Sequence, residues 1–303
     1  MTETAAIAEE VIGFKCSESQ LWGILGRPAT PGVPLETAVL IVIGGPQYRV
    51  GSHRQFVLLA RALAGAGFPT LRFDYTGMGD SEGDRRAFDA IGPDVRAAID
   101  ALCQACPAAR RIVVWGLCDA ASAALIFAAA DARVAGIVAA NPWARSPASL
   151  AAAQVKYYYV SRLLQREFWT KLLRGRLDWR ASFRALSSNL KGARSHYRQA
   201  ATGQHDGSFQ LDMARGLAGF RGRVLLILSG NDLTAKEFLD YASSSAAWKG
   251  LLDDPKVSRV DLPEADHTFS RRNWLDVVET ETITWLNRLS DPVSRVAAAS
   301  KTS

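Results

Sequence analysis

The sequence places a thiol, a carboxylate and an imidazole in contexts that suit nucleophilic catalysis. Cys118 lies in the segment WGLCDA, Asp232 follows the apolar run LLILS, and His267 lies in LPEADHTF. In such a set the histidine takes the thiol proton, the carboxylate orients the imidazole and stabilises its charged form, and the thiolate attacks an acyl carbonyl. The three residue types therefore predict a covalent acyl-thioester intermediate.

The segment around Cys118 has the spacing of a nucleophile elbow, a sharp turn between a buried strand and a helix. Small residues two before and two after the nucleophile avoid clashes in such a turn, and Gly116 and Ala120 meet that need. The usual pattern is G-x-S-x-G, and here Cys replaces Ser and Ala replaces the second Gly. Taken alone, the segment fits a small buried core cysteine about equally well.

The chain order strengthens the catalytic interpretation, because nucleophile, acid and histidine follow one another as they do in α/β-hydrolases. Asp232 comes after an expected strand, and His267 lies in the loop after the last one. Asp232 could instead be only the N-cap of the following helix. Asp266 and Glu264 are alternative acids, and His267 could be a solvated loop residue.

The oxyanion of the tetrahedral intermediate needs preorganised hydrogen-bond donors. The backbone N–H of Asp119, at the start of the expected helix, is the first candidate. The second should come from the loop after the strand TAVLIVI, which reads Gly44-Gly45-Pro46-Gln47. Pro46 has no N–H, so Gly45 or Gln47 must supply this donor.

Short β-rich runs alternate with amphipathic stretches over most of the chain, which predicts an α/β fold with a mostly parallel, doubly wound sheet and a helical cap insertion. The expected strands cover residues 10–16, 20–26, 37–43, 69–75, 111–115, 134–140, 223–228 and 257–262. The expected helices cover residues 54–65, 93–106 and 120–130, with further helices after each of the last two strands.

No convincing strand appears between Asn141 and Arg221, so we expect three parts. These are an α/β-hydrolase core at residues 1–140 and 222–295, a basic helical cap at 141–221, and a flexible tail at 296–303. Residues 145–198 carry a net charge of +10 in a chain whose total is +6, so the remainder sums to −4. The high isoelectric point is therefore a property of the cap.

This charge distribution bears on partners. A uniformly basic nucleic-acid-binding protein would not concentrate its charge in this way, so we expect no nucleic-acid partner, although a local basic face could still contact nucleic acid or anionic lipid. A basic cap suits a small acyl substrate that bears an anionic group, and it allows peripheral contact with an anionic membrane. The sequence does not indicate the oligomeric state.

Aromatic and polar residues near the expected site are candidates for substrate binding. Tyr48, His53 and Trp143 flank the oxyanion loop and the start of the cap, while Tyr158 and Trp169 lie within the cap. His53 could equally begin a helix in solvent, and aromatic residues at helical spacing more often serve packing between a cap and its core.

The composition also bears on whether the protein spans a membrane, is secreted or binds a metal. The chain is 48% hydrophobic and 22% charged, it has no apolar run long enough for a membrane span, and its acidic start is unlike a signal peptide. We therefore expect a cytoplasmic protein with four reduced cysteines. Cys103 and Cys106 form a lone CxxC without a second pair, so we expect neither a metal nor a cofactor.

Several segments resemble a known family. The stretch DYTGMGDS, from Asp74 to Ser81, is similar to the D-x-x-G-x-G-x-S turn of α/β-hydrolases. The segments GGPQYRVGSHRQF, RFDYTGMGDSEG, WGLCDAASAAL, NPWAR and KYYYVSRLLQREFWTKLLRG resemble the bacterial group called exosortase A system-associated hydrolase 1. This resemblance implies a serine-aminopeptidase-like fold, Cys118 as the nucleophile, and a role beside genes for extracellular polysaccharide production and protein sorting.

The leading functional hypothesis is hydrolysis of an ester or thioester through Cys118, His267 and Asp232. An acyltransferase would use the same acyl-enzyme but pass the acyl group to a sugar or an amine. A third hypothesis is a non-catalytic interaction module that docks through the basic cap. The presence of all three catalytic residue types argues against it, and Pro46 in the oxyanion loop argues for it.

Overall fold

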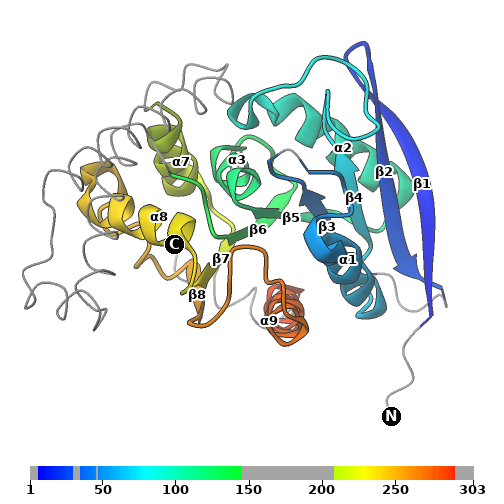
Figure 1. Cartoon of the computed structure of the whole chain (residues 1–303). Helices are drawn as coiled ribbons and strands as arrows, with labels where there is room; N and C mark the ends of the chain where they lie inside the picture. The colour runs from blue at the N-terminus through cyan, green and yellow to red at the C-terminus, as the bar shows by residue number, and fades with distance from the viewer. Residues whose placement is uncertain (1–5, 30–34, 46, 128, 145–207, 291–303) are drawn as a thin grey trace, which may run out of the picture. The chain divides into compact units, whose positions relative to one another are not determined.

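The protein is built around one eight-stranded sheet (Figure 1). The computed structural model describes residues 6–29, 35–45, 47–127, 129–144 and 208–290. The strand order is β1-β2-β4-β3-β5-β6-β7-β8. The pairs β1–β2 and β2–β4 are antiparallel, and every other neighbouring pair is parallel. The predicted α/β class with a mostly parallel sheet is confirmed.

The strands and helices occur in the predicted order, and their bounds lie close to the predicted ones. The strands are β1 Ile7–Cys16, β2 Ser19–Pro28, β3 Thr37–Val42, β4 Thr70–Asp74, β5 Arg111–Leu117, β6 Val134–Ala140, β7 Arg223–Ser229 and β8 Val257–Leu262. The described α-helices are α1 Gln55–Gly65, α2 Gly92–Ala105, α3 Asp119–Phe127, α7 Ser208–Gly219, α8 Leu233–Ser244 and α9 Arg272–Ser290. Among these helices, none is both long and apolar enough to cross a membrane.

Helices cover both faces of the sheet, which explains why the central strands are apolar throughout. All six residues of β3 are buried. Successive residues of one strand enter different cores: Leu40 packs with the side of α2 and α3, and Ile41 packs with the side of α1 and α9. Two continuous cores thus fix the sheet between the helical layers.

The predicted cap contains a helix that packs with the sheet. Contacts divide the chain into one unit of Met1–Ala144 with Phe209–Ser303 and a second unit of Arg145–Ser208. In α7, Phe209, Met213 and Leu217 are buried in the core of the first unit. Residues 145–207 and the predicted tail at 296–303 lie outside the described residues. The rest of the cap and the flexibility of the tail therefore remain predictions.

A buried ion pair fixes the loop after β3 to the end of β4. The Asp74 carboxylate, which is fully buried, accepts the backbone N–H of Arg49 at 2.7 Å and an N–H of its guanidinium group. Gly79 has a left-handed φ of 53°, and a Cβ there would collide with this carboxylate. The segment that resembles D-x-x-G-x-G-x-S therefore shapes the loop that precedes α1.

We predict that Asp74→Ala lowers the free energy of unfolding by about 3 kcal/mol, because it leaves the buried Arg49 guanidinium with only the exposed Asp80 as a counter-charge. The matched control is Asp261→Ala, which removes the exposed pair with Arg259 and should cost less than about 1 kcal/mol. Urea unfolding followed by circular dichroism measures both values. Equal losses in the two variants would contradict the prediction.

Candidate active site

Cys118 is the single residue between the last residue of β5 and the first residue of α3. Its φ is 63°, in the left-handed region that residues with a Cβ rarely adopt. A Cβ at Gly116 would collide with the backbone of Ala120, so the strand and the helix approach too closely for a larger residue. This backbone geometry is the sharp strand-to-helix turn that the sequence predicts, and it leaves part of the Cys118 residue exposed.

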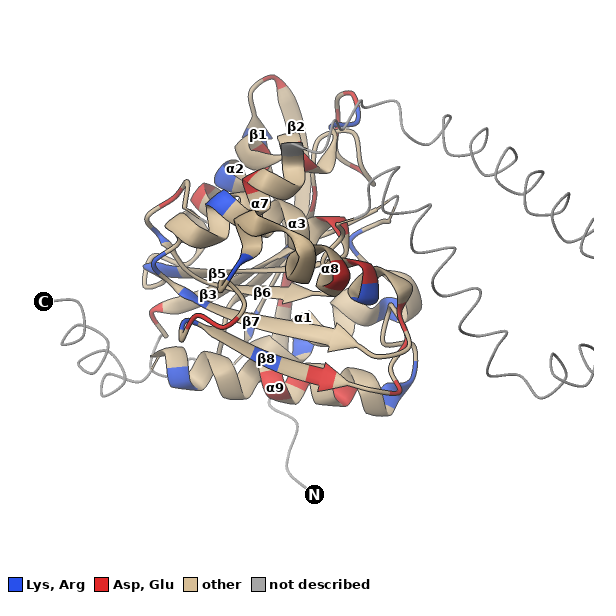
Figure 2. Cartoon of the chain, turned by 90° about the vertical axis from the view of Figure 1, so that its left-hand side faces the viewer, with Lys and Arg blue, Asp and Glu red and all other residues tan. Residues whose placement is uncertain are grey.

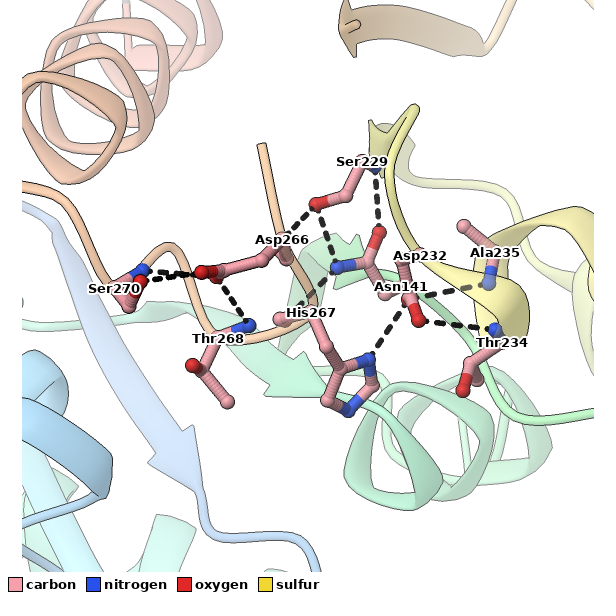
Figure 3. Close-up of polar contacts among 9 residues, drawn as sticks. All are labelled: Asn141, Ser229, Asp232, Thr234, Ala235, Asp266, His267, Thr268 and Ser270. Carbon is pink, nitrogen blue, oxygen red and sulfur yellow. Dashed lines mark hydrogen bonds and ion pairs between the residues drawn. The ribbon is translucent and has the colours of Figure 1, made fainter. Parts of the chain in front are cut away.

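Asp232 and His267 are hydrogen-bonded to each other (Figure 3). The distance from His267 Nδ1 to the nearer Asp232 oxygen is 2.8 Å. Asp232 is also the N-cap of α8 and accepts the backbone N–H groups of Thr234 at 3.0 Å and Ala235 at 3.2 Å. A carboxylate in this place can accept a hydrogen bond from Nδ1–H, and a neutral imidazole in that tautomer has its free lone pair on Nε2.

The two alternative acids lie in other environments. Glu264 is exposed. Asp266 accepts hydrogen bonds from Ser270 and from the backbone N–H of Thr268. Burial raises the pKa of Asp266, but these hydrogen bonds outweigh it and leave the pKa below its usual value. Asp266 shapes the loop that carries His267, while Asp232 contacts the imidazole (Figure 3).

Asn141 joins this loop to the sheet and was missed by the sequence reasoning. It is fully buried at the end of β6 and has a φ of 43°. Its amide nitrogen donates to Ser229 Oγ at 2.9 Å and to the His267 carbonyl at 3.0 Å, while its oxygen accepts the Ser229 backbone N–H at 2.8 Å. The one signal in the sequence was a lone asparagine directly after the apolar run VAGIVAA.

The candidate oxyanion donors have an unexpected partner. The backbone N–H of Gly45 donates to both oxygens of the Asp119 carboxylate, at 2.7 and 2.9 Å. Burial raises the pKa of Asp119, and backbone hydrogen bonds from Gly45, Ala120 and Asp119 itself oppose that rise. The Gln47 side chain accepts the Ser52 backbone N–H at 3.3 Å. Pro46 lies outside the described residues.

Three of the five predicted substrate-binding residues lie in the described part of the chain, and only one of them adjoins Cys118. Trp143 is half-buried, and its backbone N–H donates to the Cys118 carbonyl at 3.2 Å, so it adjoins the elbow. Tyr48 and His53 are exposed, and the Tyr48 hydroxyl donates to Asp80. Tyr158 and Trp169 lie outside the described residues.

The other three cysteines lie at the end of β1 and at the end of α2. None of the four cysteines forms a disulfide, and Cys103 and Cys106 lie at the end of α2. Burial raises the pKa of the Cys16, Cys103 and Cys106 thiols. Within the described part of the chain, no cluster of histidine, cysteine, aspartate and glutamate could hold a metal ion.

Solved structures share this architecture. The chain is similar to the esterase Pf2001 of Pyrococcus furiosus, with a TM-score of 0.62 and 16% identity over 94% of each chain. It is also similar to an esterase of Rhizomucor miehei (TM-score 0.62, 17% identity, 95% of this chain and 85% of that one). For Est1E of Butyrivibrio proteoclasticus, solved with ferulic acid, the TM-score is 0.58 at 13% identity, over 92% of this chain and 98% of that one. At these identities the likeness is one of fold.

A family model gives the assignment at the level of sequence. The model described as the alpha/beta hydrolase family matches residues 40–280, a span that includes Cys118, Asp232 and His267. A comparison with curated proteins finds no match. The strand order, the turn at Cys118 and the matched span agree, and the chain belongs to the alpha/beta hydrolase family.

Proposed function

We propose that this protein hydrolyses an ester or thioester through Cys118 as nucleophile, His267 as general base and Asp232 as the residue that orients His267. The observation that carries the proposal is the 2.8 Å hydrogen bond between Asp232 and His267 Nδ1, made by a carboxylate that two backbone N–H groups also hold. The left-handed backbone of Cys118 supports the assignment of the nucleophile, because such conformations cluster at functional sites.

The reaction proceeds in two stages. In the first, His267 Nε2 takes the Cys118 proton, the sulfur attacks the acyl carbonyl carbon, and the bond to the leaving group breaks as that group receives the proton. In the second, His267 takes a proton from water, the hydroxide attacks the thioester, and the carbon–sulfur bond breaks to release the acid. The proton on His267 then returns to the sulfur, and no cofactor takes part.

The oxyanion is stabilised by backbone donors at the start of α3 and in the loop after β3. The N–H of Asp119 is the first donor, and Gly45 or Gln47 supplies the second. A donor from each of two separate segments suits a developing charge, because neither segment has to reorganise during the reaction.

The substrate class follows from the likeness to esterases and from the charge of the chain. The esterase structures with the same fold favour an ester, and the basic residues between Arg145 and Arg198 favour an acyl group that bears an anion. The resemblance to exosortase A system-associated hydrolases suggests a cytoplasmic role beside extracellular polysaccharide production. In that setting, transfer of the acyl group to a sugar is the alternative outcome of the same first stage.

We predict that Cys118→Ser lowers the rate of acylation about 100-fold, because a serine hydroxyl depends more heavily on the general base than a thiol does. Cys118→Ala should show no burst of product. The measurement is the burst phase with a chromogenic thioester, followed by analysis of the acyl product with and without a sugar acceptor. Full activity in the alanine variant would contradict the nucleophile. An acyl-enzyme that turns over only when the sugar is added, and then gives acylated sugar and no free acid, would identify a transferase.

We predict that Asp232→Asn lowers kcat by about 10²- to 10⁴-fold, because an asparagine in this place cannot hold the imidazole in the required tautomer and charge state. Asp266→Asn is the matched control, and it should lower kcat less than about tenfold, since Asp266 contacts the loop and not the imidazole. Steady-state kinetics of both variants test the assignment. A larger loss of kcat in Asp266→Asn than in Asp232→Asn would identify Asp266 as the residue that orients His267.

We predict that Asn141→Ala lowers the free energy of unfolding by about 1–3 kcal/mol, because it leaves buried groups of Ser229 and His267 unpaired. It should also lower kcat with little change in KM, since Asn141 acts by positioning the His267 loop. The exposed Asn231 provides the control Asn231→Ala, which should change neither quantity. A loss of stability in Asn141→Ala with an unchanged kcat would restrict Asn141 to a structural role.

A further inference from the structure

The Asp119 side chain contacts the groups that should bind the oxyanion. Gly45 donates its N–H to both oxygens of the carboxylate, and hydrogen bonds from the Asp119 and Ala120 backbone stabilise its charged form. Asp119 and Gly45 are the candidate donors from the two segments that form an oxyanion hole. The carboxylate of the residue that carries one candidate donor is thus hydrogen-bonded to the other, the Gly45 N–H.

The backbone packs closely around this carboxylate at Gly44. A Cβ at Gly44 would collide with an Asp119 carboxylate oxygen and with the Leu117 carbonyl, and it would lie 3.0 Å from the Ala120 nitrogen. The loop after β3 therefore approaches the start of α3 closely, and the Asp119 carboxyl group lies at this approach. A substrate carbonyl oxygen has to lie about 3 Å from the same donors.

We propose that the Asp119 side chain controls access to the oxyanion hole: its carboxyl group occupies the place of the substrate's carbonyl oxygen, and it must leave before Cys118 can be acylated. This proposal rests on the proposed function of Cys118. It makes Asp119 a determinant of which esters react, because a substrate must bind strongly enough elsewhere to displace the carboxylate.

Charged and polar groups around Asp119 are consistent with a second place for its side chain. Arg85, which is exposed in the loop after β4, attracts the carboxylate. Tyr75 is buried; burial and then the charge of Asp119 raise its pKa to about 12, so the tyrosine stays neutral at ordinary pH. A carboxylate that leaves the hole therefore has a nearby cation and no ionised tyrosine to repel it.

The test compares acylation with alkylation of Cys118 in wild type, Asp119→Ala and Asp119→Asn. Acylation by p-nitrophenyl acetate develops an oxyanion, whereas alkylation by iodoacetamide does not. We expect Asp119→Ala to raise the acylation rate about tenfold or more, by freeing donors that are each worth that much or more. Alkylation should stay within about a factor of two of the wild-type rate. Asp119→Asn, which keeps the shape but not the charge, should show a smaller gain.

The outcomes separate the two proposals. An acylation rate that is unchanged or lower in both folded variants overturns the gating role of Asp119 and leaves Cys118 as the nucleophile. Equal acceleration of both reagents also overturns it, because the effect would then lie in the thiol. If iodoacetamide alkylates Cys118 but no variant is acylated there, the proposed function fails and the gating role with it. If Asp119→Ala does not fold, Asp119→Asn decides by the same criteria.

Discussion

The sharp turn at Cys118 is the constraint on which the site depends. A residue with a Cβ in the left-handed region costs about 1–3 kcal/mol, and the surrounding structure must hold it there. Here Gly116 and Ala120 allow β5 and α3 to meet, and Gly44 allows the loop after β3 to approach the same point. The turn thus presents one side chain and several backbone N–H groups in the same small space.

The rest of the site follows from the parallel sheet. The carboxyl ends of β3, β5, β6, β7 and β8 lie at one edge, so the loops that follow them meet although they are far apart in sequence. Asn141 fastens three of these segments together by contacting Ser229 and the His267 carbonyl (Figure 3). In Figure 2 the acidic and basic residues are coloured mainly on the helices, on the loops and on the edge strand β8. The central strands β3 and β6 contain no charged residue.

The strands and helices could be predicted from the sequence, but the contacts between side chains could not. Apolar runs such as TAVLIVI reveal burial, so every strand was predicted and the order of the three catalytic residue types could be placed on the fold. The contact between the Asp119 carboxylate and Gly45 could not be predicted, because no periodicity encodes where a side chain points. Asp232 was weighed as either an N-cap or a catalytic acid, and the structure gives it both sets of contacts.

The central claim is that Cys118 becomes acylated. Its most direct test is mass spectrometry of the protein quenched in acid during turnover of a thioester, with peptides mapped for the mass of the acyl group. The account predicts one acyl group on Cys118 and none on Cys16, Cys103 or Cys106, whose thiols have pKa values raised by burial. Turnover with an unmodified Cys118, or with the acyl group on another residue, would contradict it.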